Sequence, residues 1–207
     1  MKWIVGTNLR EDCTGAFEFV SWLHGHARDA DANPVVALAV VRDGGDFLNV
    51  PSGRSLIVKR VDDSAREFVS SGPARDIIKD VRVEVSPSVA ETLGQAAKNN
   101  GATLVLGRAA PMENQSLVRL GSVARRTLRR LVGPVVIVPP DWTAAVAAPG
   151  PIVVAVDPSP SSLAAITFAE TLATAVVLQL VDVAAIQGLG GLGSAFLSPA
   201  EFATLRY

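Results

Sequence analysis

A glycine-bracketed loop in the middle of the chain has the residue types best suited to binding an anion. Gly107 ends an apolar run, and Gly121 precedes a helical pattern that begins at Ser122. A glycine before a helix lets a phosphate approach the unpaired backbone N–H groups, and a serine hydroxyl adds another donor. Arg108 and Arg119 bring positive charge to the same loop. A structural interpretation stays open, in which Gly107 only ends a strand and Ser122 only caps a helix.

Other reactive side chains do not form a catalytic or metal-binding pattern. His24 and His26 are two positions apart, so a helix would direct them differently and they cannot share one metal. Cys13 is the single cysteine, which excludes a disulfide framework and favours ordinary packing. The sequence shows no Ser-His-Asp group and no carboxylates paired at helical spacing. We therefore predict no enzymatic activity.

A cluster of arginines on one helical pattern suggests contact with nucleic acid or phosphate, but a solvated flank is the stronger interpretation. Their spacing of i and i+4 forms two stripes, while Val123, Leu128 and Leu131 are expected to face a sheet. The cluster consists of Arg125, Arg126, Arg129 and Arg130.

The elements that must position these residues are short apolar runs alternating with amphipathic stretches. Val- and Ile-rich runs predict buried strands over residues 3–6, 35–41, 81–85, 103–107 and 135–138. Helical periodicity covers residues 16–23, about 64–71, 88–99 and 122–131. This alternation predicts an α/β fold with a parallel sheet covered by helices. In such a sheet, ligands bind beyond the carboxyl ends of the strands, which here means the loops 6–15 and 107–122.

The last third of the chain repeats its opening after a linker at residues 141–150. A strand at 152–156, a helix at 163–175 and a strand at 176–183 follow, and a further helix is expected from Ser198. A shift of 149 residues places Asn8 on Asp157 and Cys13 on Ser162. About half of a second repeat would be missing. The glycine-rich run at 188–193 matches a dinucleotide motif, but no helix follows directly, so a flexible loop is predicted.

Charge and composition exclude several classes of protein. Nineteen Lys and Arg against twenty Asp and Glu give a net charge of -1, which provides no long-range attraction for nucleic acid or an anionic membrane. The N-terminus lacks a signal-peptide apolar region. The most apolar stretch, residues 163–186, contains Glu170 and Asp182 and is not expected to span a membrane. We expect a cytoplasmic protein with no nucleic-acid or membrane partner.

Several motifs occur together in this chain: Asp157-x-Ser159-x-x-Ser162-x-x-Ala165, Gly107, Gly121-Ser122-Val123 and the apolar segment 133–139 with its prolines. Taken together, they resemble the universal stress protein family. The resemblance covers nearly the whole chain and is to tandem members, with one complete domain over residues 1–140 and a partial second domain over 151–207. It implies a Rossmann-like, doubly wound, five-stranded parallel sheet in the order 3-2-1-4-5 with helices on both faces. It also implies a regulatory role in the stress response and a homodimer formed through the strand Val135 to Val138.

One subset of this family binds ATP, through Gly-x-x-Gly, nine residues and Gly-Ser/Thr. This chain has Ala110 in place of the second glycine, one extra loop residue, and Asn8 in place of an acidic residue. The resemblance implies a site for ATP with Mg, or for another adenine nucleotide, in the first domain. The alternative is a dimeric interaction protein of the same family that binds no nucleotide. A third, weaker alternative is slow ATP hydrolysis. The implied site consists of Thr7, Asn8 and Val41 around adenine, and of Gly107, Arg108, Gly121, Ser122 and Val123 around the phosphates.

Overall fold

The computed structural model describes residues 2–10, 13–26, 34–43, 51–108, 120–130, 133–143, 152–157, 159–172, 178–182 and 204–205. The chain divides into two compact units, Met1–Val146 and Ala147–Tyr207, which are described separately. These limits lie close to the predicted linker, and the assignment of each unit as a stress-protein domain stays a prediction.

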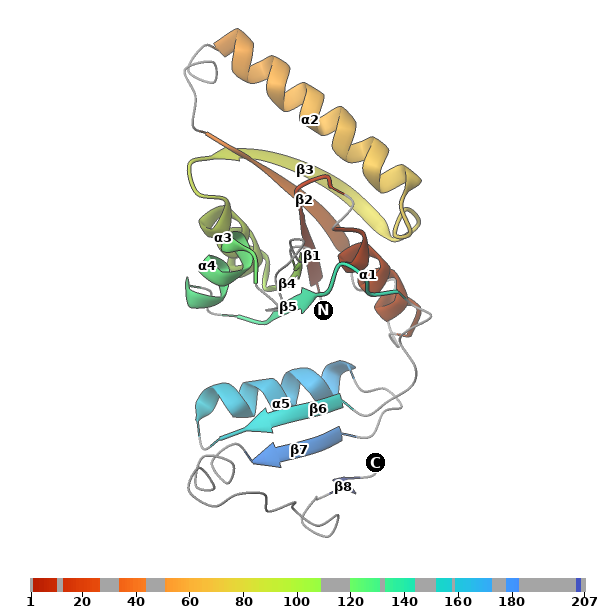
Figure 1. Ribbon diagram of the computed structural model, residues 1–207, viewed down its shortest axis with the longest axis vertical. Helices are drawn as coiled ribbons and strands as arrows, with labels where there is room; N and C mark the ends of the chain where they lie inside the picture. Colours follow the sequence, from red (N-terminus) through yellow and green to blue (C-terminus); the bar gives the residue numbers. More distant parts are fainter. Residues whose placement is uncertain are drawn as a thin grey trace, which may run out of the picture. The chain divides into compact units, whose positions relative to one another are not determined.

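The sheet of the first unit is parallel throughout, with the order β3-β2-β1-β4-β5 (Figure 1). β1 is the central strand, because it pairs with β2 on one edge and with β4 on the other. This confirms the predicted five-stranded, doubly wound α/β fold in the order 3-2-1-4-5. The strands are β1 (Lys2–Thr7), β2 (Val35–Arg42), β3 (Ile78–Ser86), β4 (Ala102–Gly107) and β5 (Val135–Val138).

Helices cover both faces of this sheet. Figure 1 shows α3 and α4 on one side and α1 and α2 on the other, as right-handed crossovers require when the strand order reverses after β3. Among the described helices, none is both long and apolar enough to cross a membrane. The helices are α1 (Thr14–His26), α2 (Pro51–Ser71), α3 (Val89–Asn100) and α4 (Ser122–Arg130).

The core on the α3 side is built from leucine and isoleucine on the central strands. Leu104 is completely buried and Leu106 is 4% exposed, and both pack with Ile4, Leu38 and Leu93. Burying one such side chain contributes about 1.5–3 kcal/mol, so these residues account for much of the attachment of α3 to the sheet. α3 is followed by Gly101, whose φ of 55° is left-handed and whose N–H donates to the carbonyl of Lys98.

Aromatic side chains join the helices on the opposite face. Phe17 on α1 and Phe68 on α2 meet edge to face, with ring centroids 5.3 Å apart. Phe19, Trp22 and Trp142 form a second group with centroid separations of 5.4 to 6.1 Å. Trp142 follows β5 in the chain, so this aromatic group packs the segment after β5 against α1.

The extent of α2 and the burial of β3 differ from the sequence prediction. α2 begins at Pro51 rather than near residue 64, because proline is well suited to the first turn and the half-buried Ile57, Val58 and Val61 extend the apolar stripe. β3 was expected to be buried on both faces. It is an edge strand of the described sheet, and Arg82 and Glu84 are exposed on one of its faces.

α4 is rotated relative to the predicted orientation. Leu128 was expected to face the sheet but is 44% exposed, whereas Ala124 and Thr127 are buried. The two buried positions are three residues apart, so they lie on one helical face, and Leu128 lies about 100° around the helix from Thr127. Leu131 lies outside the described residues.

The second unit contains β6 (Ile152–Val156), α5 (Pro160–Leu172), β7 (Leu178–Asp182) and β8 (Thr204–Leu205). β6 and β7 are parallel, with Ile152 opposite Leu178. β8 pairs with β7 in the antiparallel sense, so the helix expected from Ser198 does not continue into residues 204–205. At residues 204–205 the backbone pairs with the neighbouring strand β7 instead of forming hydrogen bonds along a helix. Ser198 itself and the glycine-rich run at 188–193 lie outside the described residues.

Candidate functional site

The carboxyl ends of β1, β2 and β4 form an uneven edge at which the strand order reverses. The last described pair of β1 and β2 is Thr7 with Ala39, but β2 continues to Arg42. On the other side, β1 pairs with β4 as far as Gly6 and Leu106. β1 therefore ends between two neighbours, the position at which open α/β sheets bind ligands.

Hydrogen bonds at the two ends of β2 fix the direction of its backbone groups. At the amino end the carbonyl of Pro34 accepts the N–H of Trp3 on β1, and at the carboxyl end the N–H of Asp43 donates to the carbonyl of Ser86 at the end of β3. Backbone groups alternate in direction along a strand, so those of Val41 face β3 and those of Val40 and Arg42 face the β1 side. Val41, predicted to contact adenine, is accordingly opposite Val85 in the β2–β3 ladder.

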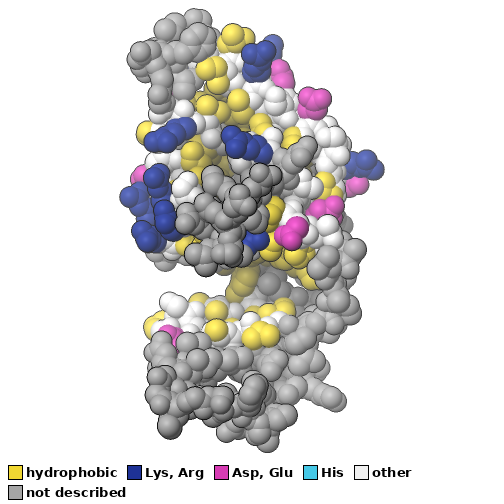
Figure 2. Space-filling view, in the orientation of Figure 1, with side chains coloured by type: hydrophobic (Ala, Val, Ile, Leu, Met, Phe, Trp, Pro, Cys, Tyr) yellow, Lys and Arg dark blue, Asp and Glu magenta, His cyan; other side chains and the backbone are white. Residues whose placement is uncertain are grey.

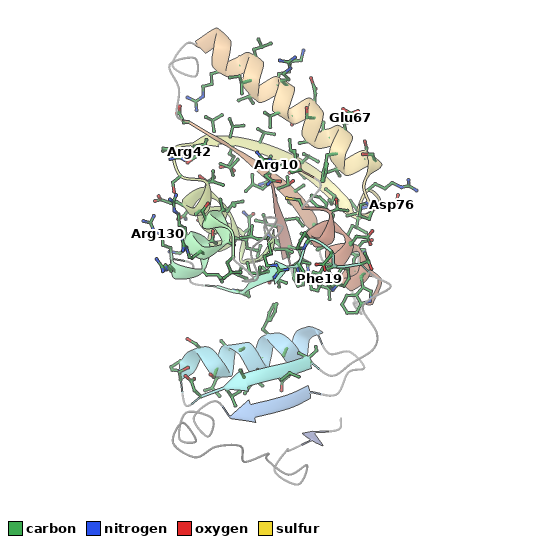
Figure 3. The ribbon with its side chains drawn as sticks, viewed as in Figure 1. Arg10, Phe19, Arg42, Glu67, Asp76 and Arg130 are labelled. Carbon is green, nitrogen blue, oxygen red and sulfur yellow. The ribbon has the colours of Figure 1, made fainter. Side chains whose placement is uncertain are left out.

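A tight turn after β1 fixes the side chains of Thr7 and Asn8. The Thr7 hydroxyl accepts the N–H of Leu9 at 3.0 Å, and Leu9 has a left-handed φ of 60°. Asn8 Oδ1 accepts the N–H of Arg10 at 3.0 Å and the Cys13 thiol at 2.8 Å. Asn8 is exposed, whereas Cys13 is buried at the start of α1. Figure 3 shows Arg10 beyond the end of β1 and Arg42 at the end of β2.

Arg108, directly after β4, carries a buried donor that no described residue pairs. Its backbone N–H donates to the carbonyl of Val138 at 2.7 Å, which continues the β4–β5 ladder by one residue. Its side-chain Nε is buried and has no hydrogen-bond partner among the described residues. Leaving such a donor unmet costs about 1–3 kcal/mol, more when it is charged. A positively charged donor of this kind fits a ligand that presents an anionic oxygen.

Gly121, Ser122 and Val123 lie at the beginning of α4. The Gly121 carbonyl accepts the N–H of Arg125 at 3.0 Å, so Gly121 occupies the N-cap position and Ser122 is the first helical residue. The alternative in which Ser122 is the cap is thereby excluded. The first N–H groups of α4 have no acceptor within the helix, as an anion site requires. The loop from 109 to 119, with Ala110 and Arg119, lies outside the described residues.

The arginine cluster occupies the solvent side of α4. All four side chains are exposed, and Figure 2 shows Lys and Arg side chains gathered over this helix. Arg130, at the end of α4 in Figure 3, is 3.9 Å from the carboxylate of Glu91 on α3. Both partners are 70% exposed, so the pair contributes little to stability. The solvated flank inferred from the sequence accounts for this arrangement.

The second unit repeats the hydrogen bonds of the first at the predicted shift of 149 residues. Asp157 Oδ1 accepts the N–H of Ser159 at 3.1 Å and the hydroxyl of Ser162, as Asn8 accepts Arg10 and Cys13. The N–H of Ser162 donates to the Ser159 carbonyl at 3.1 Å, as Cys13 donates to Arg10 at 3.0 Å. Hydrogen bonds from Ser159 and Ser162 lower the pKa of the Asp157 carboxyl.

Sequence reasoning missed a cavity of about 630 Å³ between α3 and the β3 side of the sheet. It contains none of the predicted site residues. Its rim includes Arg82, paired with Asp80 at 2.6 Å, and Gln95, which donates to Asn99 at 2.6 Å. These polar groups are satisfied by one another, and their charges are of mixed sign. For a charged ligand, the unpaired donor of Arg108 is the stronger physical indication.

The fit of the edge site to a nucleotide is uneven. Its phosphate end has suitable donors in Arg108 Nε and the first turn of α4. At the other end, both lone-pair directions of Asn8 Oδ1 are already occupied by hydrogen bonds within the chain. Asn8 Oδ1 therefore does not offer a ligand a further acceptor. The pairing of Asn8 with Cys13 could have been inferred from the equivalent five-residue spacing of Asp157 and Ser162.

Comparison with known proteins gives structural likeness without sequence relatives. No family model and no curated protein matches the sequence. A solved universal stress protein from Archaeoglobus fulgidus is 18% identical, with a TM-score of 0.50 over 67% of this chain and 98% of its own. Another, from Archaeoglobus fulgidus DSM 4304, is 16% identical, with a TM-score of 0.64 over 91% of this chain and 71% of its own. At these identities the likeness shows that this chain has the doubly wound α/β fold of those proteins.

Proposed function

We propose that the chain is a universal stress protein of the tandem type whose first unit binds an adenine nucleotide as a regulatory ligand. The observation that carries this proposal is the buried Nε of Arg108 at the carboxyl end of β4, for which the described residues provide no hydrogen-bond acceptor. The family motifs and the likeness to two solved universal stress proteins support it. The recurrence of three hydrogen bonds at a shift of 149 residues supports the tandem arrangement.

The described residues suggest how the ligand would be held. Arg108 and the first turn of α4, from Gly121 through Val123, would surround the phosphates with donors. Gly107 would leave room beside them, and Mg²⁺ accompanying ATP would offset part of the phosphate charge. Thr7, Asn8 and the end of β2 around Val41 would face the nucleoside.

Calorimetric titration of the nucleotide-stripped chain with MgATP, and with GTP for comparison, tests this proposal. We expect saturable binding of about one ATP per chain. Gly121→Asp should abolish the heat, because a carboxylate at the start of α4 repels the phosphates. Gly133→Asp is the matched control, since Gly133 is exposed and a Cβ there meets no atom within 4 Å. No heat with the unmodified chain, confirmed by a second binding method, would contradict nucleotide binding.

A second candidate function is a dimeric interaction protein that binds no nucleotide. The observation that favours it is β5, a strand of four aliphatic residues with no further neighbour in the described sheet. An apolar edge of this kind favours pairing with a second copy. The carbonyls of Pro134 and Val138 accept bonds from β4, so the backbone groups of Val135 and Ile137 face the open edge.

Sedimentation velocity distinguishes the assembly state. We expect a dimer at micromolar concentration and a monomer for Ile137→Pro, which removes an outward N–H and leaves the β4–β5 hydrogen bonds in place. A circular dichroism melt of the variant establishes that it is folded. A monomeric unmodified chain, or a folded Ile137→Pro dimer, would exclude dimerisation through this edge.

A further inference from the structure

We propose that the cavity between α3 and β3 is a second binding site, which takes a neutral ligand with an apolar body and one hydroxyl or amide group. Its volume of about 630 Å³ lies within the roughly 300–1,000 Å³ of small-molecule sites. None of the described residues that line it belongs to the proposed nucleotide site beyond the carboxyl ends of β1 and β4. The inference therefore goes beyond the proposed function and does not depend on it.

The cavity forms because the two faces of β3 carry different side chains. Side chains alternate along a strand, so Val81, Val83 and Val85 form one row, which is half-buried on the side of α2 (Figure 1). Arg82 and Glu84 belong to the other row and are exposed on the α3 side. α3 packs mainly over β2, β1 and β4. A trough is therefore left between this helix and the polar row of β3.

The floor of the trough is aliphatic. Ile4 on β1 and Leu38 on β2 belong to the core and are 4% and 2% exposed. Val36 on β2 and Ala96 on α3 pack against this core, but they are only half-buried and line the cavity. Because the side chain of Ala96 is small, it leaves part of the trough unfilled. An apolar ligand would remove the remaining aliphatic surface from water.

The charges around the cavity favour a neutral ligand. Arg82 is already paired with Asp80 at 2.6 Å, and Glu91 lies 3.9 Å from Arg130. A charged ligand would lose water against the aliphatic floor and find no buried group of opposite charge among the described lining residues. The charged residues of that lining are two cations and two carboxylates, all exposed: Lys2, Arg82, Glu84 and Glu91.

Three half-buried hydroxyl groups line the end of the cavity where β3 leads into α3. The Thr92 hydroxyl donates to the Ser88 carbonyl at 3.0 Å, which leaves only its lone pairs for a ligand. Ser86 Oγ accepts the N–H of Ser88 at 3.3 Å and donates to no described residue. The Ser88 side chain makes no hydrogen bond that caps α3. A hydroxyl or amide group could donate to Thr92 and accept from Ser86, whereas a purely apolar ligand would leave both unmatched.

Titration of the ¹⁵N-labelled chain with 2-naphthylmethanol tests this proposal. We expect saturable shifts centred on the amides of Val36 and Ala96. Its methyl ether, which accepts but cannot donate, should bind about fivefold more weakly. 2-Naphthoate and 2-naphthylmethylamine carry a negative and a positive charge on the same rings, and both should bind at least about tenfold more weakly than the alcohol. Equal or tighter binding of either charged compound would overturn the neutral class of ligand.

Ala96→Leu should abolish these shifts because the larger side chain fills the trough. Ala164→Leu is the matched control, since it makes the same change at an exposed position of α5 and should leave binding unchanged. Urea unfolding establishes that both variants are folded. A folded Ala96→Leu chain that still binds the alcohol would place the ligand elsewhere and refute the proposal.

A second measurement uses only the unmodified chain and does not depend on the folding of a variant. Nuclear Overhauser effects should connect the naphthyl ring protons with the methyl groups of Val36 and Leu38. Saturating ATP should not displace the alcohol, because the two sites share no described residue. Displacement by ATP, or the absence of saturable shifts, would overturn the second site. Failure of the chain to bind ATP would refute the proposed function alone.

Discussion

Replacing Gly15 by alanine is expected to destabilise the first unit, although alanine is the better helix former. Gly15 is buried in the first turn of α1. A Cβ there would overlap the carbonyl oxygen of Pro139 and lie 3.1 Å from that of Pro140. Backbone carbonyls just after β5 cannot move aside as a flexible side chain can. The helix would have to shift, and with it Cys13, which anchors Asn8.

The size of the effect can be worked out against a control in the same helix. Gly25 is exposed near the end of α1, and a Cβ there meets nothing within 4 Å. Gly25→Ala should therefore stabilise by roughly 0.5 kcal/mol through helix propensity alone. Gly15→Ala has a similar gain but an overlap cost of about 1–3 kcal/mol, for a net loss of about 1–2 kcal/mol.

Urea unfolding followed by tryptophan fluorescence is the appropriate assay. Trp3, Trp22 and Trp142 are the only tryptophans of the chain and all belong to the first unit, so the signal reports that unit. A difference of about 2 kcal/mol between the two variants corresponds to roughly 1 M in the urea midpoint. Equal midpoints for Gly15→Ala and Gly25→Ala would refute the argument from the close approach of Pro139.

Three further predictions follow from particular positions. Gly101→Ala should destabilise the first unit by about 1 kcal/mol, because alanine is strained at the left-handed φ of 55°; Gly101→Asn should lose less in the same urea assay. Leu93→Ala should cost about 2–5 kcal/mol and Leu128→Ala well under that, since the two side chains are 3% and 44% exposed; similar losses would contradict the core assignment. The Asp157 carboxyl should titrate below its ordinary 3.8 in an NMR experiment, because Ser159 and Ser162 favour its ionised form. Its contribution to stability is then present above the unfolded pKa and lost as pH falls through the lower folded pKa, and a midpoint at or above 3.8 would contradict these hydrogen bonds.

The order of elements in the first unit could be predicted because it depends on local patterns. Apolar runs such as Val135–Val138 are strands in the structure at the predicted bounds. The start of α2 was missed because residues 51–63 are rich in charge and their stripe of half-buried residues becomes evident only against the sheet. The orientation of α4 was predicted wrongly because the leucine was expected to be the buried residue. In the structure the smaller side chains of Ala124 and Thr127 are buried in a close contact, and Leu128 is exposed.

The candidate site was less predictable because its properties depend on hydrogen-bond direction. The sequence correctly places Gly107 at the end of β4 and Gly121 before α4. It does not show which edge of β2 carries the amide of Val41, since that depends on the register with β3. Nor does it show that Arg108 buries an Nε that has no acceptor in the described part of the chain. These features arise from packing and strand register, which residue types alone do not determine.

The equivalent turns of the two units differ in a chemically consistent way. In the second unit a carboxylate is held by two hydroxyl donors, and such charge-assisted bonds are stronger than neutral ones. In the first unit a neutral amide is held by a thiol and a backbone N–H. Because the amide does not titrate as a carboxylate does, acidification leaves this acceptor and its hydrogen bonds unchanged. Acidification should therefore loosen the turn at Asp157 while leaving the turn at Asn8 in place. If Asn8 alone were replaced by aspartate, a charged acceptor would face the weak thiol donor of Cys13. If Cys13 alone were replaced by serine, a hydroxyl donor would face a neutral amide acceptor. The effects of substitutions at residues 8 and 13 on stability are therefore expected not to be additive.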